Sequence, residues 1–348
     1  MGKIVGQEPE YRCSDGQKII VSKRNVVMRE EKIRFSIIMP AYNAEKHIVR
    51  GINSVLNQTF QNFELIIIND GSGDKTSELV KRFSDERLIL IEKEHEGISI
   101  ARNTGIRQAR GSYICFLDAD DEFLPHHLSH IDQLIYDYPT RGFFSTTFNV
   151  SMRYDANVVI TRETTGSVDY YRNASQEKQK RGEIIWTGCV CIKKELFDLY
   201  GMFEPGVQIS EDTDMWRRIY VHTGIVYSDN VTVKRNRDGS QASIKYPLYF
   251  EADPLNRFPA LLQDKTIADD IKDSLRGEYE QLKYRVVRSY LYIGNKKQAM
   301  EHFKKIDKKR FSKVRILTIY IVFLCPTILF RKHQQYRHKG YYEFDDKE

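Results

Sequence analysis

The sequence contains few cysteines, and their spacing follows no regular pattern. The five are Cys13, Cys115, Cys189, Cys191 and Cys325, an odd number with irregular spacing in 348 residues. Small secreted scaffolds need many paired cysteines, and zinc sites need Cys or His clusters, so the pattern argues against both classes. We expect a reducing compartment, with Cys189 and Cys191 as buried packing thiols.

The sequence also has no long apolar stretch in its first 30 residues and, over most of its length, no net charge. The first 30 residues hold no continuous apolar stretch of the length that a signal peptide needs. The formal charge is +6, yet residues 301–348 hold 12 Lys and Arg against 6 Asp and Glu, which leaves residues 1–300 neutral. No nucleic-acid-binding module accompanies this basic tail, so we expect a protein that is not secreted and binds no nucleic acid.

Between residues 35 and 117, short β-branched apolar runs alternate with amphipathic stretches. Such an alternation predicts βαβ units, that is, an α/β fold with a mostly parallel sheet flanked by helices. Ligands bind this kind of sheet beyond the carboxyl ends of its strands. Polar clusters follow three of the predicted strands, at residues 40–43, 69–72 and 118–121.

The last of these clusters contains paired carboxylates. One small residue separates Asp118 from Asp120, so both side chains point the same way on an extended backbone. Such a pair can bind a hard divalent cation, with phosphate oxygens and water as the other ligands. Asp121 adds a third acid, and three acids at a buried strand end repel one another unless a cation is present. The alternative is that Asp120 or Asp121 caps the helix that begins near residue 124.

Two other acidic groups have ordinary structural explanations. Asp70 stands in an Asp-Gly-Ser-Gly turn before a helix, which is common turn chemistry. Glu211 and Asp212 follow Ser210, a typical helix cap, and the helix dipole stabilises an acidic first turn by about 0.3–1 kcal/mol. The order of motifs along the chain favours functional roles.

Four motifs follow one another: Pro-Ala-Tyr-Asn at 40–43, Asn-Asp-Gly-Ser at 69–72, Gly-Ile-Ser-Ile-Ala-Arg-Asn-Thr-Gly at 97–105 and Phe-Leu-Asp-Ala-Asp-Asp at 116–121. In this order they resemble the family 2 glycosyltransferases, which have a Rossmann-like fold called GT-A. The resemblance continues through Trp-Thr-Gly at 186–188 and Ser-Glu-Asp at 210–212, and covers about residues 34–240.

The resemblance implies a nucleotide-sugar donor and residues that bind it. Pro40, Tyr42 and Asn43 would frame the nucleotide base. Asp70 would accept a hydrogen bond from the base, and Arg102 would help to hold the base or the diphosphate.

It also implies the residues at the reacting end of the donor. Asp118 would contact the ribose, and Asp120 would bind Mn²⁺ or Mg²⁺ between the two phosphates. Asp212 would be the general base that activates the acceptor hydroxyl, with Glu211 orienting the acceptor. Arg237 stands where relatives often carry a His, and an Arg there could bind the diphosphate directly.

Two further features distinguish this sequence within the resemblance. His95 occupies a place where many relatives have Asn, which puts the base contacts there in question. The Gln-x-x-Arg-Trp signature of processive membrane synthases is absent. We therefore expect an enzyme that adds a single sugar.

The C-terminal tail combines an apolar run with basic flanks. Residues 316–330 are almost continuously apolar, and Lys and Arg surround them. The run is shorter than the about 20 residues of a membrane span and contains Pro326. We expect it to lie on a membrane surface; a true span and a helix packed on the protein or on a partner remain alternatives.

The chain divides into four predicted regions. They are an N-terminal extension (1–33), a GT-A catalytic domain (34–245) with its nucleotide-binding half up to about residue 121, a helical region (246–310) and a basic apolar tail (311–348). In the helical region, Tyr290, Gly294, Ala299 and Phe303 are spaced like one tetratricopeptide-type hairpin.

The leading hypothesis is a metal-dependent inverting glycosyltransferase, peripheral on the cytoplasmic face of the cell membrane. It would move a sugar from a nucleotide-sugar to a saccharide or lipid-linked saccharide in cell-surface polysaccharide synthesis. A UDP-sugar is the favoured donor. The alternative is a catalytically silent binding module of the same fold that acts as a membrane adaptor. A dinucleotide-dependent oxidoreductase is disfavoured because no Gly-x-Gly-x-x-Gly follows the first strand.

Overall fold

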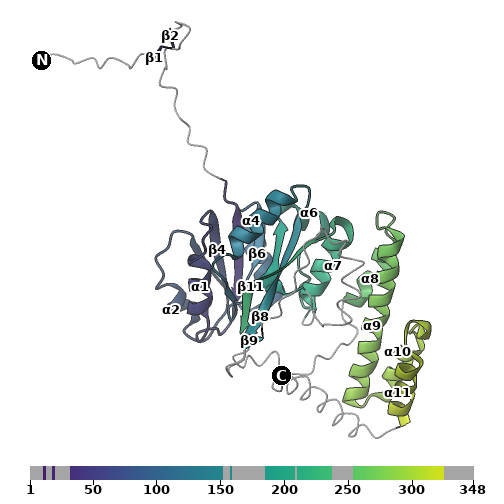
Figure 1. The fold of residues 1–348 in the computed structure, drawn as a ribbon. Coiled ribbons are helices and arrows are strands. Elements are labelled where there is room, and N and C mark those ends of the chain that lie inside the picture. The colour runs from purple at the N-terminus through teal and green to yellow at the C-terminus, as the bar shows by residue number, and fades with distance from the viewer. Residues whose placement is uncertain are drawn as a thin grey trace, which may run out of the picture. The chain divides into compact units, whose positions relative to one another are not determined.

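A computed structural model describes residues 11–12, 18–19, 32–151, 157–158, 185–207, 210–236 and 254–324. The chain forms two units, Met1–Lys32 and Ile33–Glu348. In the first unit, β1 (Tyr11–Arg12) and β2 (Lys18–Ile19) pair antiparallel. All elements discussed below belong to the second unit (Figure 1).

A nine-stranded sheet organises the described part of the second unit, and its first half is parallel. The strands lie in the order β5 (Leu88–Lys93), β4 (Phe63–Asp70), β3 (Phe35–Ala41) and β6 (Tyr113–Phe116). All three pairings among them are parallel, as the βαβ pattern predicts.

The second half of the sheet is mixed. β10 (Val190–Lys193) runs antiparallel to β6 and to β8 (Phe143–Ser151), whereas β8 pairs parallel with β11 (Val226–Asn236). Two short strands, β7 (Glu122–Phe123) and β9 (Asn157–Val158), pair antiparallel with β11 and β8. A short apolar run such as that of β10 carries no signal for strand direction, so the sequence did not predict this reversal.

Successive strand residues point to opposite faces of the sheet, and each face has its own hydrophobic core. One core contains Ile38 and Ile66 and receives α3 (Ile98–Gln108), α6 (Glu195–Tyr200) and α7 (Glu211–Thr223). The other contains Ile37 and Leu65 and receives α1 (Ile48–Leu56), α2 (Thr76–Val80) and α4 (His127–Asp137). Cys189 and Cys191 are buried free thiols in the second core, as expected.

The C-terminal region is helical. α8 (Pro254–Gln263) and the first half of α9 (Asp269–Ile293) pack into the core of α7 through Phe258 and Leu275. The second half of α9, together with α10 (Lys296–Lys304) and α11 (Lys313–Leu324), forms a separate core. The predicted hairpin is confirmed: Gly294 ends α9 at a φ of 91°, and Ala299 and Phe303 are buried.

Within the described residues, no helix is both long enough and apolar enough to cross a bilayer. The rest of the apolar run beyond Leu324 lies outside the described residues.

Candidate active site

Strands β3, β4 and β6 run parallel, so the polar segments that follow them meet at one edge of the sheet. Asn43 joins two of these segments: its N–H donates to Ser72 Oγ (3.0 Å), and its Oδ1 accepts from the Gly73 N–H (2.9 Å). Tyr42 and Asn43 are exposed and accessible to a ligand. Pro40 is buried inside β3 and supports this edge from within the sheet.

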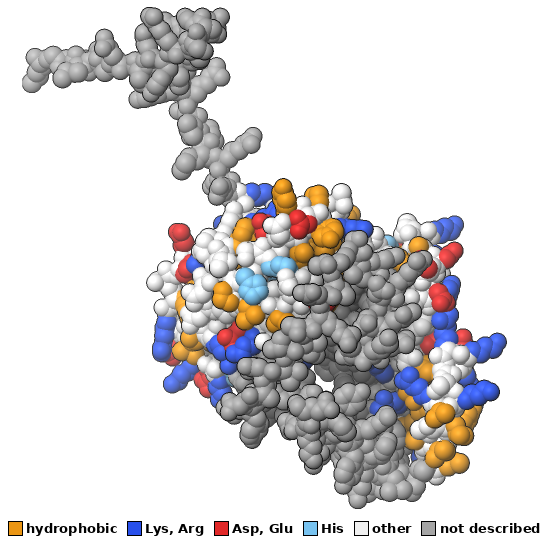
Figure 2. Space-filling model, in the orientation of Figure 1, with side chains coloured by type: hydrophobic (Ala, Val, Ile, Leu, Met, Phe, Trp, Pro, Cys, Tyr) orange, Lys and Arg blue, Asp and Glu red, His pale blue; other side chains and the backbone are white. Residues whose placement is uncertain are grey.

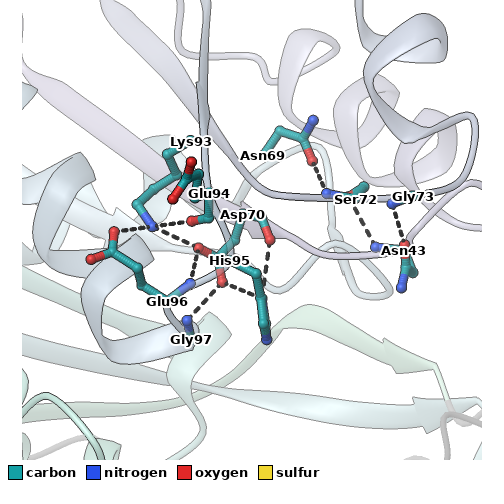
Figure 3. Close-up of polar contacts among 10 residues, drawn as sticks. All are labelled: Asn43, Asn69, Asp70, Ser72, Gly73, Lys93, Glu94, His95, Glu96 and Gly97. Atoms are coloured by element: carbon teal, nitrogen blue, oxygen red, sulfur yellow. Dashed lines mark hydrogen bonds and ion pairs between the residues drawn. The ribbon is translucent and has the colours of Figure 1, made fainter.

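The Asp70 carboxylate, which is 4% exposed, is surrounded by donors from the segment at the end of β5 (Figure 3). Oδ1 accepts from Lys93 Nζ (2.8 Å) and from the Glu96 N–H (3.1 Å). Oδ2 accepts from the Gly97 N–H (2.9 Å) and lies 2.9 Å from His95 Nδ1. We call these five residues the Asp70 cluster.

The surroundings of Asp70 favour its charged form. Burial acts to raise the pKa of this carboxyl group. The hydrogen bonds from Lys93 and from the Glu96 and Gly97 amides, with the positive charge of Lys93, outweigh burial and hold the pKa below its ordinary value. Asp70 is therefore an organising anion for the segment that follows β5.

His95 also stacks on Tyr42. The ring centroids are 4.0 Å apart, and the ring planes are inclined by 21°. Gly71 has to be a glycine beside this stack, because its φ is +72° and a Cβ would lie 2.7 Å from the His95 backbone nitrogen. Tyr42 and His95 thus present aromatic surface next to the Asp70 cluster.

Arg102, on α3, is buried between carboxylates from two distant parts of the chain. Its Nη2 donates to Asp118 Oδ1 (2.9 Å), and its Nη1 donates to Glu211 Oε1 (3.0 Å). The Arg102 side chain is 2% exposed, and the Phe203 ring lies 5.3 Å from its guanidinium carbon. Arg102 therefore ties the start of α7 to the end of β6.

Five carboxylates lie at the end of β6 and the start of α7, and we call them the acidic edge: Asp118, Asp120, Asp121, Glu211 and Asp212. Burial and the charge of Asp118 raise the pKa of Asp120. Burial and the charges of Asp118 and Asp120 raise the pKa of Asp121 to about 7. Burial and the charge of Asp212 raise the pKa of Glu211. Negative charge at this edge is thus under-compensated by the protein itself.

Asp121 is held by two donors, Trp186 Nε1 (2.8 Å) and the Asn236 N–H (2.9 Å). The prediction that Asp120 or Asp121 caps the next helix is wrong. α4 begins only at His127, no side chain caps it, and β7 comes between. The chain pairs with β11 before it turns into the helix, and the sequence pattern gave no sign of that pairing.

Asp212 lies in the first turn of α7. Its Oδ2 accepts from Thr187 Oγ1 (3.0 Å), and its Oδ1 accepts from the Thr213 N–H (2.6 Å). Ser210 is the N-cap residue of this helix, as predicted, but it has a φ of +63° and its side chain makes no capping hydrogen bond. Strained backbone of this kind is typical of functional sites.

The family model described as Glycosyl transferase family 2 matches residues 36–201. This range includes the Asp70 cluster, Arg102 and the three carboxylates that follow β6. Residues 36–201 of this chain belong to glycosyltransferase family 2.

Curated relatives of this chain differ in how much of their length it spans. Glycosyltransferase GlyG of Streptococcus pneumoniae is 25% identical over 301 residues, which are 80% of this chain and 93% of GlyG. GlyA of the same organism is 36% identical over 107 residues, 30% of this chain but only 15% of GlyA. The Escherichia coli protein WfgD, named UDP-Glc:alpha-D-GlcNAc-diphosphoundecaprenol beta-1,3-glucosyltransferase, is 47% identical over 94 residues, 27% of this chain and 37% of WfgD.

Solved structures show that this chain has the GT-A fold. S. aureus TarS 1-349, crystallised with UDP-GlcNAc, superimposes with a TM-score of 0.63 at 18% identity, covering 88% of this chain and 92% of TarS 1-349. The mannosyltransferase PcManGT of Pyrobaculum calidifontis, in complex with GDP-Man and Mn²⁺, has a TM-score of 0.52 at 19% identity, with coverages of 90% and 88%. The predicted fold class is confirmed.

Some site residues escape sequence reasoning, and one predicted residue cannot be placed. Arg237 lies outside the described residues. Lys93, Trp186 and Thr187 were assigned no role from the sequence. Lys93 and Thr187 contact the predicted site residues Asp70 and Asp212, and Trp186 contacts Asp121 beside them. Lys93 is the register partner of Asp70 on the neighbouring parallel strand, a pairing that the structure shows and the sequence pattern does not.

Proposed function

We propose that this chain is an inverting, metal-dependent glycosyltransferase that moves one sugar from a nucleoside-diphosphate sugar to a saccharide or lipid-linked saccharide in cell-surface glycan synthesis. The observation that carries the proposal is the buried link from Asp118 through Arg102 to Glu211, which joins the donor side of the sheet to the helix that bears Asp212. UDP-sugars are the favoured donors, because TarS was crystallised with UDP-GlcNAc and the name of WfgD specifies UDP-Glc.

The acidic edge suits a divalent cation. Among the described residues, no three Asp, Glu, His or Cys side chains form a complete metal site, so the donor diphosphate and water would supply further ligands. Asp120 is the proposed protein ligand, because its pKa is raised by burial and by the neighbouring Asp118. A cation bound there would neutralise the charge that develops on the leaving diphosphate. PcManGT, which has the same fold, was crystallised with Mn²⁺.

Asp212 is the proposed general base. Its carboxylate would take the proton from the acceptor hydroxyl while that oxygen bonds to the anomeric carbon. The bond from the anomeric carbon to the diphosphate breaks in the same step, so the nucleoside diphosphate leaves and the configuration inverts. Thr187 and the first turn of α7 fix the position of Asp212 for this step.

The proposal includes attachment to the cytoplasmic face of the cell membrane through α11. Val314, Leu317, Ile321 and Leu324 form an exposed apolar stripe on this helix, while Ile319 faces the core. A helix that is apolar on all sides needs an apolar environment on its free side. In Figure 2, hydrophobic side chains gather at the lower right, where Figure 1 places α10 and α11, with Lys and Arg beside them. This arrangement suits anionic lipid.

A cavity of about 340 Å³ lies along the same helix and is lined by apolar side chains and two lysines. Its lining residues are Lys308, Phe311, Lys313, Ile316, Leu317 and Tyr320. Flotation with anionic vesicles tests the attachment: Leu317→Glu with Leu324→Glu should lose binding. Leu199→Glu on α6, an equally exposed apolar position, should keep it.

Release of nucleoside diphosphate from a panel of sugar nucleotides, with Mn²⁺, Mg²⁺ or EDTA, tests the activity. We expect release with one UDP-sugar, dependent on metal and stimulated by a saccharide acceptor. Full activity in EDTA would contradict metal dependence. Binding of a sugar nucleotide without turnover by any acceptor tested would instead support the silent adaptor, although such a module has no need for Asp120 and Asp212.

A further inference from the structure

The Asp70 carboxylate has no acceptor position left for a ligand. A carboxylate offers about four lone-pair positions, and Lys93, His95 and the Glu96 and Gly97 amides take four hydrogen-bond positions on Asp70. The carboxylate is also 4% exposed. A base N–H could reach Asp70 only by displacing one of these donors.

His95 stands between Asp70 and solvent. Its Nδ1 lies 2.9 Å from Asp70 Oδ2 and 3.1 Å from the Asp70 carbonyl oxygen, and both atoms are acceptors. The proton of the neutral imidazole is therefore on Nδ1, which leaves Nε2 as an acceptor. Figure 3 shows that the opposite edge of the ring, which carries Nε2, points away from Asp70. The side chain is 51% exposed. No partner of Nε2 is seen within the described part of the chain.

The stack on Tyr42 fixes the plane of the imidazole. With centroids 4.0 Å apart and Nδ1 held by Asp70, the His95 ring can neither rotate nor flip without losing contacts. Nε2 is thus a fixed acceptor beside an exposed aromatic face. This is a suitable arrangement for a planar heterocycle whose edge carries a ring N–H.

We propose that His95 Nε2, and not the Asp70 carboxylate, accepts the ring N–H of the donor's nucleotide base, with Asp70 acting as the positioning residue that sets the His95 tautomer. The inference rests on the proposed nucleotide-sugar donor. It selects bases that carry a ring N–H on the pairing edge, such as uracil, over cytosine, which has an unprotonated nitrogen there.

Calorimetric binding of UDP, CDP and N3-methylated UDP to the full chain tests the assignment. Wild type should bind UDP at least about tenfold more tightly than either analogue, because each leaves Nε2 without a donor. His95→Phe retains a ring to stack on Tyr42 but has no acceptor. It should bind UDP about tenfold more weakly and lose the preference over N3-methylated UDP.

His222→Phe is the matched control, because His222 also stacks on a tyrosine, Tyr200, with centroids 4.7 Å apart. This variant should keep both the affinity for UDP and the preference. If His95→Phe retains the preference, the acceptor lies elsewhere and the assignment is wrong. If wild type binds none of the nucleotides, the proposed donor fails together with the assignment.

Discussion

Asp70 and Asp121 are both nearly buried carboxylates at the same edge of one sheet, yet their surroundings act in opposite directions. Asp70 is surrounded by donors and a lysine, and its pKa lies below the ordinary value. Asp121 has two donors but also two neighbouring carboxylates, and its pKa is raised to about 7. Burial acts to raise the pKa of both groups. At Asp70, hydrogen bonds and the charge of Lys93 outweigh burial, whereas at Asp121 the neighbouring carboxylates add to it.

The two regions therefore differ in what they require from a ligand. In the Asp70 cluster, the charge of the Asp70 carboxylate is compensated by Lys93 and by three further donors. The cluster positions the aromatic surface of Tyr42 and His95. At the acidic edge, the protein's own positive groups do not balance the negative charge of the carboxylates. A bound cation would reduce the repulsion between these carboxylates. The comparison predicts that substitutions at the acidic edge impair chemistry, while substitutions in the Asp70 cluster impair binding and stability.

The largest expected effect is that of Asp212→Asn. Loss of the base should lower transfer by about 10²–10⁴-fold while the Kd for UDP stays unchanged. Steady-state release of nucleoside diphosphate, with parallel calorimetry, measures both quantities. Normal transfer by this variant would remove Asp212 from its role.

Asp120→Ala should lower transfer by about 10²–10³-fold and abolish the response to Mn²⁺. A titration of activity against metal concentration checks this expectation. Asp198→Ala, at an exposed position on α6, is the control and should leave the titration unchanged. An Asp120→Ala variant with wild-type turnover would contradict the metal-dependent mechanism.

Asp70→Asn should lower the free energy of unfolding by about 1–3 kcal/mol at pH 7, because buried donors lose their charged acceptor. The folded-state pKa of Asp70 lies below the unfolded value, so its stabilisation is present above about pH 4 and is lost as the pH falls through the folded-state pKa. Urea unfolding of both proteins between pH 3 and pH 7 should show the difference shrinking at the acid end. If the difference in the free energy of unfolding did not change with pH, the charge of Asp70 would not be the source of the stabilisation.

The smallest expected effect is that of Thr187→Val, which removes a hydroxyl donor from Asp212 Oδ2. We expect a reduction in kcat of about tenfold or less, with little change in the KM for the donor. Thr187→Ser keeps the hydroxyl and should restore most of the rate. A change confined to KM would show that Thr187 serves binding.

The sequence allowed the parallel strands and their polar ends to be predicted, because strand periodicity and ligand placement follow local rules. Asp118 and Asp120 could be placed at a strand end for the same reason. The contacts of Arg102 could not be predicted, since they join Asp118 and Glu211 across separate elements. The left-handed Ser210 was also missed, because its conformation depends on tertiary packing and not on its residue type.

The long helix α9 joins two hydrophobic cores. Its 25 residues give a rod of about 37 Å. In its first half, Glu278 pairs with Arg217 of α7, the helix that carries Glu211 and Asp212. Toward the other end, Leu291 packs in the core shared with α11. If α11 lies on a lipid surface, as proposed, α9 would separate the proposed reaction centre from the bilayer. That separation would limit the length of a lipid-linked acceptor that reaches the centre.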